Sequence, residues 1–201
     1  LAWKERGYGV LGISADVSVA ADRVRVVAEL SSQWKQLHIL VNCAGTNIRK
    51  ASTEYSAEEL ELIHQTNIMS AFELSRGLHP LLKAASASSI LNIGSTAGLS
   101  MVPTGAPYAM SKAAMDHLTR YLAVEWAADG IRVNSIAPGF VDTPMQQGGF
   151  TAATQAFIDA LPMGRQATAE EIAAVAVFLA SAHASYVTGA VLNLTGGAWM
   201  G

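Results

Sequence analysis

Short apolar, β-branched runs alternate with longer helical stretches along the chain, and this alternation constrains the fold more than any other feature. The predicted strands are Val10–Ile13, His38–Val41, Ser89–Ile93, Arg132–Ile136 and Ala190–Leu194. Strands that are apolar throughout are typically buried on both faces under helices. Crossovers through helices are right-handed and build a parallel sheet. We therefore predict an α/β fold: a doubly wound, Rossmann-like parallel sheet in three layers.

The helical stretches carry recognisable start signals. Two pairs have capping-box spacing, Ser56 with Glu59 and Thr168 with Glu171. In this motif each side chain satisfies a free amide at the helix start, and apolar residues at helical spacing follow both pairs. A further helix is predicted from about Pro107 to Ala127. Gln146 to Gln166 is predicted to form a substrate lid, with an ordinary surface loop as the alternative.

Composition narrows the functional class. The chain has 201 residues, 51% of them hydrophobic, and a net charge of −3 from 13 basic and 16 acidic residues, without a basic cluster. We expect one domain, residues 1–201, with no nucleic-acid partner. Cys43 is the single cysteine, and the apolar run Ile172 to Ala180 is too short to cross a bilayer, so we expect a cytoplasmic protein without a membrane partner. The histidines show no metal-ligand spacing, and we assign no metal.

Tyr108 and Lys112 form the most informative polar pair. Positions four residues apart share a helix face, which brings the ammonium near the phenol. A positive charge about 4 Å away, worth roughly 4 kcal/mol at an effective dielectric of 20, would lower the phenol pKa by about three units. Tyr108 could then exchange a proton with an alcohol or carbonyl. The alternative is a surface tyrosine beside a solvated lysine.

Two further polar residues are candidates for the same site as Tyr108 and Lys112. Ser95 follows the predicted strand Ser89–Ile93, where its hydroxyl can hold a substrate oxygen; the alternative is a turn-forming serine. Asn67 lies mid-helix among apolar residues, where an amide needs partners. It is either an anchor for an ordered water near Lys112 or a satisfied core asparagine.

In combination these motifs resemble the classical short-chain dehydrogenase/reductase family. The motifs in register are Leu40–Gly45 (LVNCAG), Thr66-Asn67, Ser95, Tyr108 with Lys112, and Asn134 with Pro138-Gly139. The resemblance covers essentially all of the chain. It implies an oxidoreductase that moves hydride between NAD(P)(H) and a carbonyl or secondary alcohol. Tyr108 would be the general acid/base, Lys112 would lower its pKa, Ser95 would polarise the carbonyl, and Asn67 would support a proton relay.

The same resemblance implies a set of cofactor contacts. Asp16 and Val17 correspond to the adenine contact, and Asn42, Ala44 and Gly45 to the adenosine-ribose side. Lys112 and Tyr108 would face the ribose beside the nicotinamide. The nicotinamide-side loop would be formed by Pro138, Gly139, Val141 and Thr143.

Two phrases are more specific: Gly45–Lys50 (GTNIRK) and Ala123–Ala127 (AVEWA) resemble the tropinone-reductase-like branch. This likeness favours NADP, while NAD stays open. Arg49 and Lys50 are either substrate contacts or a solvated loop. The helices at Tyr108–Ala127 and Thr168–Ala180 resemble the family's subunit-contact helices, so we expect a homodimer or homotetramer.

The family's first β-α-β unit, with its glycine-rich turn, has no counterpart here, so we expect an N-terminally incomplete domain. Val10–Ile13 would then be an edge strand without its usual neighbour. Two alternatives stay open. One is a truncated, catalytically silent paralogue that acts only as an oligomerising domain, and the other is a 3-oxoacyl-acyl-carrier-protein reductase.

Overall fold

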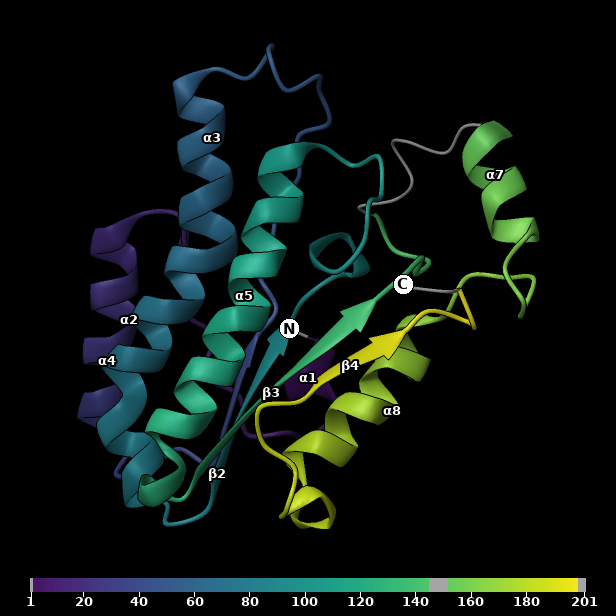
Figure 1. The fold of residues 1–201 in the computed structure, drawn as a ribbon. Helices are drawn as coiled ribbons and strands as arrows, with labels where there is room; N and C mark the ends of the chain where they lie inside the picture. Colours follow the sequence, from purple (N-terminus) through teal and green to yellow (C-terminus); the bar gives the residue numbers. More distant parts are fainter. Residues whose placement is uncertain (1, 145–151, 199–201) are drawn as a thin grey trace.

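A computed structural model describes residues 2–144 and 152–198, and within these ranges the protein is an α/β fold built on a four-stranded parallel sheet (Figure 1). The strands are β1 Ile39–Asn42, β2 Ser88–Ile93, β3 Ile131–Pro138 and β4 Val191–Leu194. They lie in the order β1-β2-β3-β4 and pair in parallel throughout. Four of the predicted strands are therefore confirmed, as is the predicted fold class.

Helices connect and cover the strands. The α-helices are α1 Ala2–Glu5, α2 Ala20–Gln33, α3 Ala57–His64, α4 Ser70–Ala84, α5 Ala106–Glu125, α7 Ala152–Asp159 and α8 Ala169–Ala180. The shorter turns are the π-helix η1 Gln65–Met69 and the 3₁₀ turns η2 Thr96–Gly98, η3 Ala127–Asp129 and η4 Ala182–Ala184. Both predicted capping boxes are present, at the starts of α3 and α8. Residues 145–151, which include the beginning of the predicted lid, lie outside the described residues.

The apolar core consists of two layers, one on each face of the sheet. Ile90 of β2 packs with Leu82 of α4 and Leu122 of α5. The next residue, Leu91, packs with Leu179 of α8 on the opposite face. This alternation follows from the two-residue period of a strand, and it places α4 and α5 on one side and α8 on the other (Figure 1). The carboxyl ends of the strands are thereby held at one edge.

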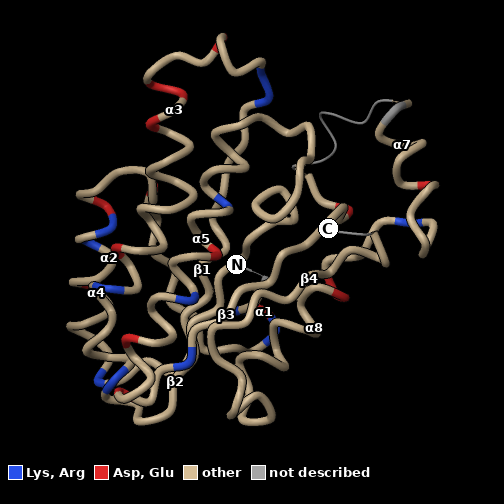
Figure 2. The backbone as a smooth tube through the Cα atoms, in the orientation of Figure 1, with Lys and Arg blue, Asp and Glu red and all other residues tan. Residues whose placement is uncertain are grey.

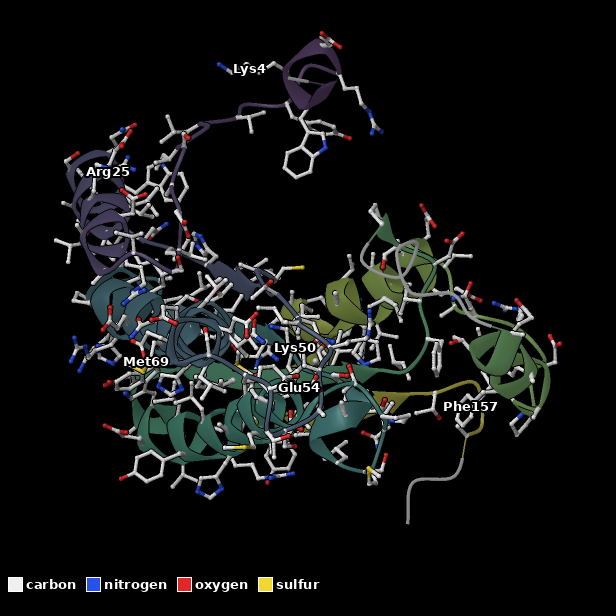
Figure 3. All side chains as sticks on the ribbon, turned by 90° about the horizontal axis from the view of Figure 1, so that it is seen from above. Lys4, Arg25, Lys50, Glu54, Met69 and Phe157 are labelled. Carbon is white, nitrogen blue, oxygen red and sulfur yellow. The ribbon has the colours of Figure 1, made fainter. Side chains whose placement is uncertain are left out.

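The predicted strand at Val10–Ile13 is wrong. Residues 8–16 carry no regular secondary structure, and in the described sheet β1 is the edge strand. A β-strand exists only where its amides and carbonyls join a neighbouring ladder, so an apolar run without a partner strand stays irregular. Figure 3 shows this segment running from α1, where Lys4 stands apart from the rest of the ribbon, to α2, where Arg25 lies.

We looked for a basic surface, a membrane-spanning helix and a metal-binding group of side chains. Lys and Arg are spread over several elements instead of gathering on one face (Figure 2). Across residues 2–144 and 152–198, no helix is both long and apolar enough to span a bilayer. Within the same residues, no group of three or more His, Cys, Asp or Glu side chains could hold a metal ion.

Candidate active site

Ser95 lies immediately beyond the carboxyl end of β2. It caps the 3₁₀ turn η2, and its Oγ accepts a hydrogen bond of 3.2 Å from the Ala97 amide. The turn sits directly on α5, because a Cβ built on Gly98 would lie only 2.6 Å from the backbone carbon of Lys112. Glycine at this position therefore allows the close contact that brings Ser95 toward the helix.

Tyr108 and Lys112 lie one turn apart on α5, as their spacing predicts. The Ser95 side chain lies close enough to the Tyr108 phenol to lower its pKa through hydrogen bonding. The Lys112 ammonium lies 5.6 Å from the centroid of the Tyr108 ring and donates a 2.8 Å hydrogen bond to the Ile93 carbonyl of β2. Lys112 is only 4% exposed. The structure thus brings the three predicted side chains together at the end of β2.

The expected lowering of the Tyr108 pKa by Lys112 is wrong for this structure. Burial raises the pKa of the Tyr108 phenol, against the opposing effects of the Ser95 hydrogen bond and the positive charge of Arg49. The reason is geometric: the Lys112 ammonium donates to the Ile93 carbonyl and approaches the ring of Tyr108. The protonated phenol is therefore the stable form at neutral pH.

The Lys112 amine is the more strongly perturbed group. Burial lowers its pKa from 10.5 to about 8, and the nearby Cys43 and Asp116 act in the opposite direction. A buried ammonium loses hydration that a single carbonyl cannot replace, and this is the origin of the shift. Lys112 consequently changes charge within reach of neutral pH.

Asn67 is fully buried and lies in the π-helix η1 between α3 and α4. Its Oδ1 accepts a 2.8 Å hydrogen bond from the Thr46 amide, and its Nδ2 donates to the Thr46 carbonyl and to Ser111 Oγ at 2.9 and 3.0 Å. π-Turns inside helices frequently occur at functional sites. The sequence analysis placed Asn67 in the middle of a regular helix and did not predict the π-helix. The amide is satisfied, and it also lies within the cluster formed with Lys112.

Gly45 marks the point where these side chains meet the loop after β1. A Cβ at Gly45 would lie 3.6 Å from Asn67 Oδ1 and 3.7 Å from Lys112 Nζ, an ordinary van der Waals separation. Ala44 precedes it on the same loop. The Asn42 side chain instead turns toward the helices, where its Nδ2 donates to Asn92 Oδ1 at 2.8 Å and to Ser75 at 3.2 Å. Its amide therefore links β1 to β2 and to α4.

Asp16 and Val17 lie in the loop that leads into α2. The exposed Asp16 carboxylate accepts hydrogen bonds from the Ser18 amide and hydroxyl at 2.9 and 2.7 Å, which lower its pKa. The Val17 carbonyl accepts from Arg23, a buried side chain that also binds Gln65 in η1. Arg23, which the sequence did not single out, thus ties this loop to the turn that holds Asn67.

The four residues predicted for the nicotinamide side follow β3. Pro138 ends the strand, and the Gly139 amide donates 2.9 Å to the Leu194 carbonyl at the end of β4. Val141 forms an isolated parallel bridge with Ala167. Thr143 is half-buried at the end of the described segment. These residues lie along one segment at the carboxyl edge, and a Cβ on Gly139 would lie 4.0 Å from Thr96 Cγ2 in the turn that Ser95 caps.

Arg49 and Lys50 have different electrostatic partners. Lys50 pairs with Glu59 of α3 at 2.5 Å, so its charge is neutralised on the surface. The positive charge of Arg49 lowers the pKa of Tyr108 and therefore acts on the group of side chains around that phenol. Ser111, which holds Asn67, was also missed by sequence reasoning, although its place inside the Tyr108–Lys112 segment was a usable signal.

Comparison with known proteins gives consistent matches along the chain. A family model described as Enoyl-(Acyl carrier protein) reductase matches residues 2–198. Two tropinone reductase homologs of Arabidopsis thaliana are 41% identical over 201 residues and 44% identical over 200 residues; the alignments cover 97% and 98% of this chain and 75% and 74% of the relatives. A gluconate 5-dehydrogenase from Burkholderia cenocepacia, solved in complex with NADP and tartrate, superimposes with a TM-score of 0.91 at 28% identity. It covers 98% of this chain, which in turn covers 78% of it.

Proposed function

Because the chain belongs to the short-chain dehydrogenase/reductase family, we propose that it transfers hydride between NADP(H) and a small carbonyl or secondary-alcohol substrate. The observation that carries the proposal is the contact set at the end of β2. Ser95 lies close enough to Tyr108 to act on its pKa, and Lys112 and Asn67 lie around Gly45. This set contains a hydroxyl donor, a proton carrier and a buried amine, which are the groups that carbonyl reduction requires.

The donor set fits a nicotinamide dinucleotide. An ammonium has three N–H donors, and the Ile93 carbonyl takes one from Lys112, which leaves others for ribose hydroxyls. Asp16 and Val17 would hold the adenine end, and Asn42, Ala44 and Gly45 the adjoining ribose. Pro138, Gly139, Val141 and Thr143 would hold the nicotinamide end. When bound, the cofactor supplies or accepts the hydride.

The protein's own groups handle the oxygen and its proton. Ser95 donates a hydrogen bond to the substrate oxygen and holds it against Tyr108. In the reducing direction Tyr108 gives its proton to that oxygen as the carbon receives hydride, and the raised pKa of the phenol suits this acid role. In the proposed relay, the Lys112 ammonium would return a proton to Tyr108, and Asn67 would anchor an ordered water near Lys112. The protonated phenol, the stable form at neutral pH, is the form that the reducing direction uses.

The matched test compares Tyr108→Phe with Tyr121→Phe. Both residues lie on α5, but Tyr121 is 64% exposed and away from the cluster. We expect Tyr108→Phe to lose about 10²–10⁴-fold in turnover, followed as NADPH consumption with a panel of cyclic ketones and keto acids, while Tyr121→Phe keeps the original rate. A Tyr108→Phe variant with the original rate would remove this residue from the mechanism.

The silent-paralogue alternative is tested by binding. Fluorescence titration with NADPH and NADH separates a cofactor-binding enzyme from an oligomerising domain, which would bind neither. The acyl-carrier-protein alternative requires a basic docking patch near the site. The ion pair between Lys50 and Glu59 leaves Arg49 without a second free cation beside it on that loop, which favours a small-molecule substrate.

We also propose that further copies of the chain cover the outer faces of α5 and α8, which lie on opposite sides of the sheet. We propose the cytoplasm as the place where the protein acts. Large apolar side chains are exposed on both helices, Tyr121 and Val124 on α5 and Val177 and Phe178 on α8. Burying them would remove apolar surface from water. Sedimentation velocity should give a dimer or tetramer for the wild type and a smaller species for Val124→Lys. Unchanged sedimentation of that variant would exclude the α5 face.

A further inference from the structure

A row of polar residues continues along α5 beyond the catalytic pair. Tyr108, Lys112, Asp116 and Arg120 follow one another at four-residue spacing, so they occupy one stripe of the helix. Tyr108 and Lys112 belong to the proposed reaction, and Arg120 lies at the exposed end of the stripe. The role of Asp116, which is only 1% exposed, is unexplained by the steps above.

Burying the Asp116 carboxylate costs solvation free energy that few hydrogen bonds replace. Its Oδ1 accepts one hydrogen bond, 3.1 Å from Ser135 Oγ of β3, and its Oδ2 has no hydrogen-bond partner among the described residues. A buried carboxylate with so few donors is unfavourable unless nearby positive charge compensates it. The positive groups that act on it are Lys112 and Arg120, one turn before and one turn after it on α5.

The carboxyl lies directly under the strand end that organises the site. A Cβ built on Gly94 would lie 3.0 Å from Asp116 Oδ1 and 2.9 Å from Ser135 Oγ, so this pair fills the space a side chain would need. Gly94 stands between Ile93, whose carbonyl accepts a hydrogen bond from Lys112, and Ser95, which acts on the Tyr108 pKa. Asp116 and Ser135 thus lie against Gly94, the residue between these two.

The charged groups around Lys112 also favour its ammonium form. From its own helix Lys112 is faced by Asp116 and by the ring of Tyr108, and from the loop after β1 it is faced by Cys43. Asp116 and Cys43 both favour the ammonium form, against the cost of burial. Of these groups, Asp116 is the one with a carboxylate.

We propose that Asp116 is a positioning residue: its buried carboxylate, held by Ser135, keeps the Lys112 side chain charged and directed toward the Ile93 carbonyl. The inference rests on the proposed function, because a charged Lys112 matters for catalysis only if Lys112 acts in the reaction. Without the carboxylate, Lys112 loses its ammonium form at lower pH. The site then loses N–H donors for ribose hydroxyls and the positive charge beside Tyr108.

The test measures the Lys112 amine directly by NMR titration of lysine side-chain ¹³Cε signals in the full chain. The chain has only four other lysines, Lys4, Lys35, Lys50 and Lys83, and Lys112→Arg assigns the signal. In Asp116→Asn, which keeps the side-chain shape, we expect the Lys112 midpoint to fall to lower pH, because a charge that favours the ammonium form is removed. Glu125→Gln, an exposed carboxyl on the same helix, is the matched control and should leave the midpoint in place.

A second measurement covers the case in which Asp116→Asn does not fold. In the wild type, the Asp116 ¹³Cγ signal should report an ionised carboxyl at pH 7. Ser135→Ala, which keeps the carboxylate and removes its hydrogen bond, should shift Lys112 less than Asp116→Asn does. A protonated Asp116 at pH 7, or an unchanged Lys112 midpoint in a folded Asp116→Asn, overturns the proposal.

The activity readout separates the two hypotheses. If the enzyme turns over carbonyl substrate, the alkaline fall of kcat/KM in Asp116→Asn should move to lower pH by the shift seen for Lys112, while a purely structural role would lower activity equally at all pH values. Absence of NADPH binding and turnover in the wild type would refute the proposed function, and the NMR result would still decide whether Asp116 sets the charge of Lys112.

Discussion

Replacing Lys112 by methionine should change how the stability of the protein depends on pH. The pKa of Lys112 is about 8 in the folded protein and 10.5 when exposed. Between these values the unfolded chain holds a proton that the folded chain has released. Stability must therefore rise with pH through this window, because the unfolded state binds more protons. Methionine fills a similar volume and does not titrate, so Lys112→Met should lack this rise.

The magnitude follows from the two pKa values. With an amine of pKa about 8 in the folded state and 10.5 in the unfolded state, raising the pH from about 7 to about 9.5 stabilises the wild type by about 2 kcal/mol relative to the variant. The whole shift corresponds to about 3 kcal/mol, but the part above pH 9.5 overlaps with tyrosine titration. Lys112 is 4% exposed, so solvent screening takes little from this value.

Urea denaturation at half-unit steps of pH measures this directly. The relevant quantity is the difference in unfolding free energy between wild type and Lys112→Met at each pH, since other titrating groups largely cancel in it. Lys35→Met, a change at an exposed lysine, is the control and should give a difference that is flat with pH. A flat difference for Lys112→Met as well would refute the reasoning, because it would mean that Lys112 is as easily protonated in the fold as in water.

The remaining predictions concern single contacts. Gly98→Ala should lower both Tm and turnover, because its Cβ would lie 2.6 Å from the Lys112 backbone and push η2, with Ser95, away from α5; circular dichroism and NADPH assays would show it. Arg49→Gln removes a positive charge that lowers the Tyr108 pKa, so the pH midpoint for alcohol oxidation should move upward, and a pH–rate profile with an unmoved midpoint contradicts this. Leu82→Ala, fully buried between α4 and the sheet, should cost about 3 kcal/mol in urea denaturation, with less than about 1 kcal/mol arguing that the core collapses around it.

Local patterns sufficed for much of the architecture. The capping boxes at Ser56 and Thr168 depend on residues three apart, and both are present as read from the sequence. The strand β2 could likewise be located from its own apolar run. Val10–Ile13 has the same local character, yet it forms no strand, because strand formation depends on a neighbouring ladder that local composition does not reveal.

At the site, too, local spacing predicted some features and others depended on contacts between distant parts of the chain. Spacing alone placed Tyr108 and Lys112 on one helix face, and the motif order predicted that Ser95 and Asn67 would join them. The sequence could also have drawn attention to Asp116, which continues the four-residue spacing, but it could not show that Ser135 of β3 binds its carboxylate.

The chain's sequence by itself determined the α/β class, the helix starts, the spacing of Tyr108 and Lys112 and the family to which the chain belongs, since all of these depend on residue types and short separations. Only the tertiary structure decided the protonation chemistry. The Tyr108 phenol has a raised pKa and the Lys112 amine a lowered one because burial between α5 and the strand ends removes water from both. Desolvation depends on what packs around a group from distant parts of the chain, and a one-dimensional pattern does not contain that information.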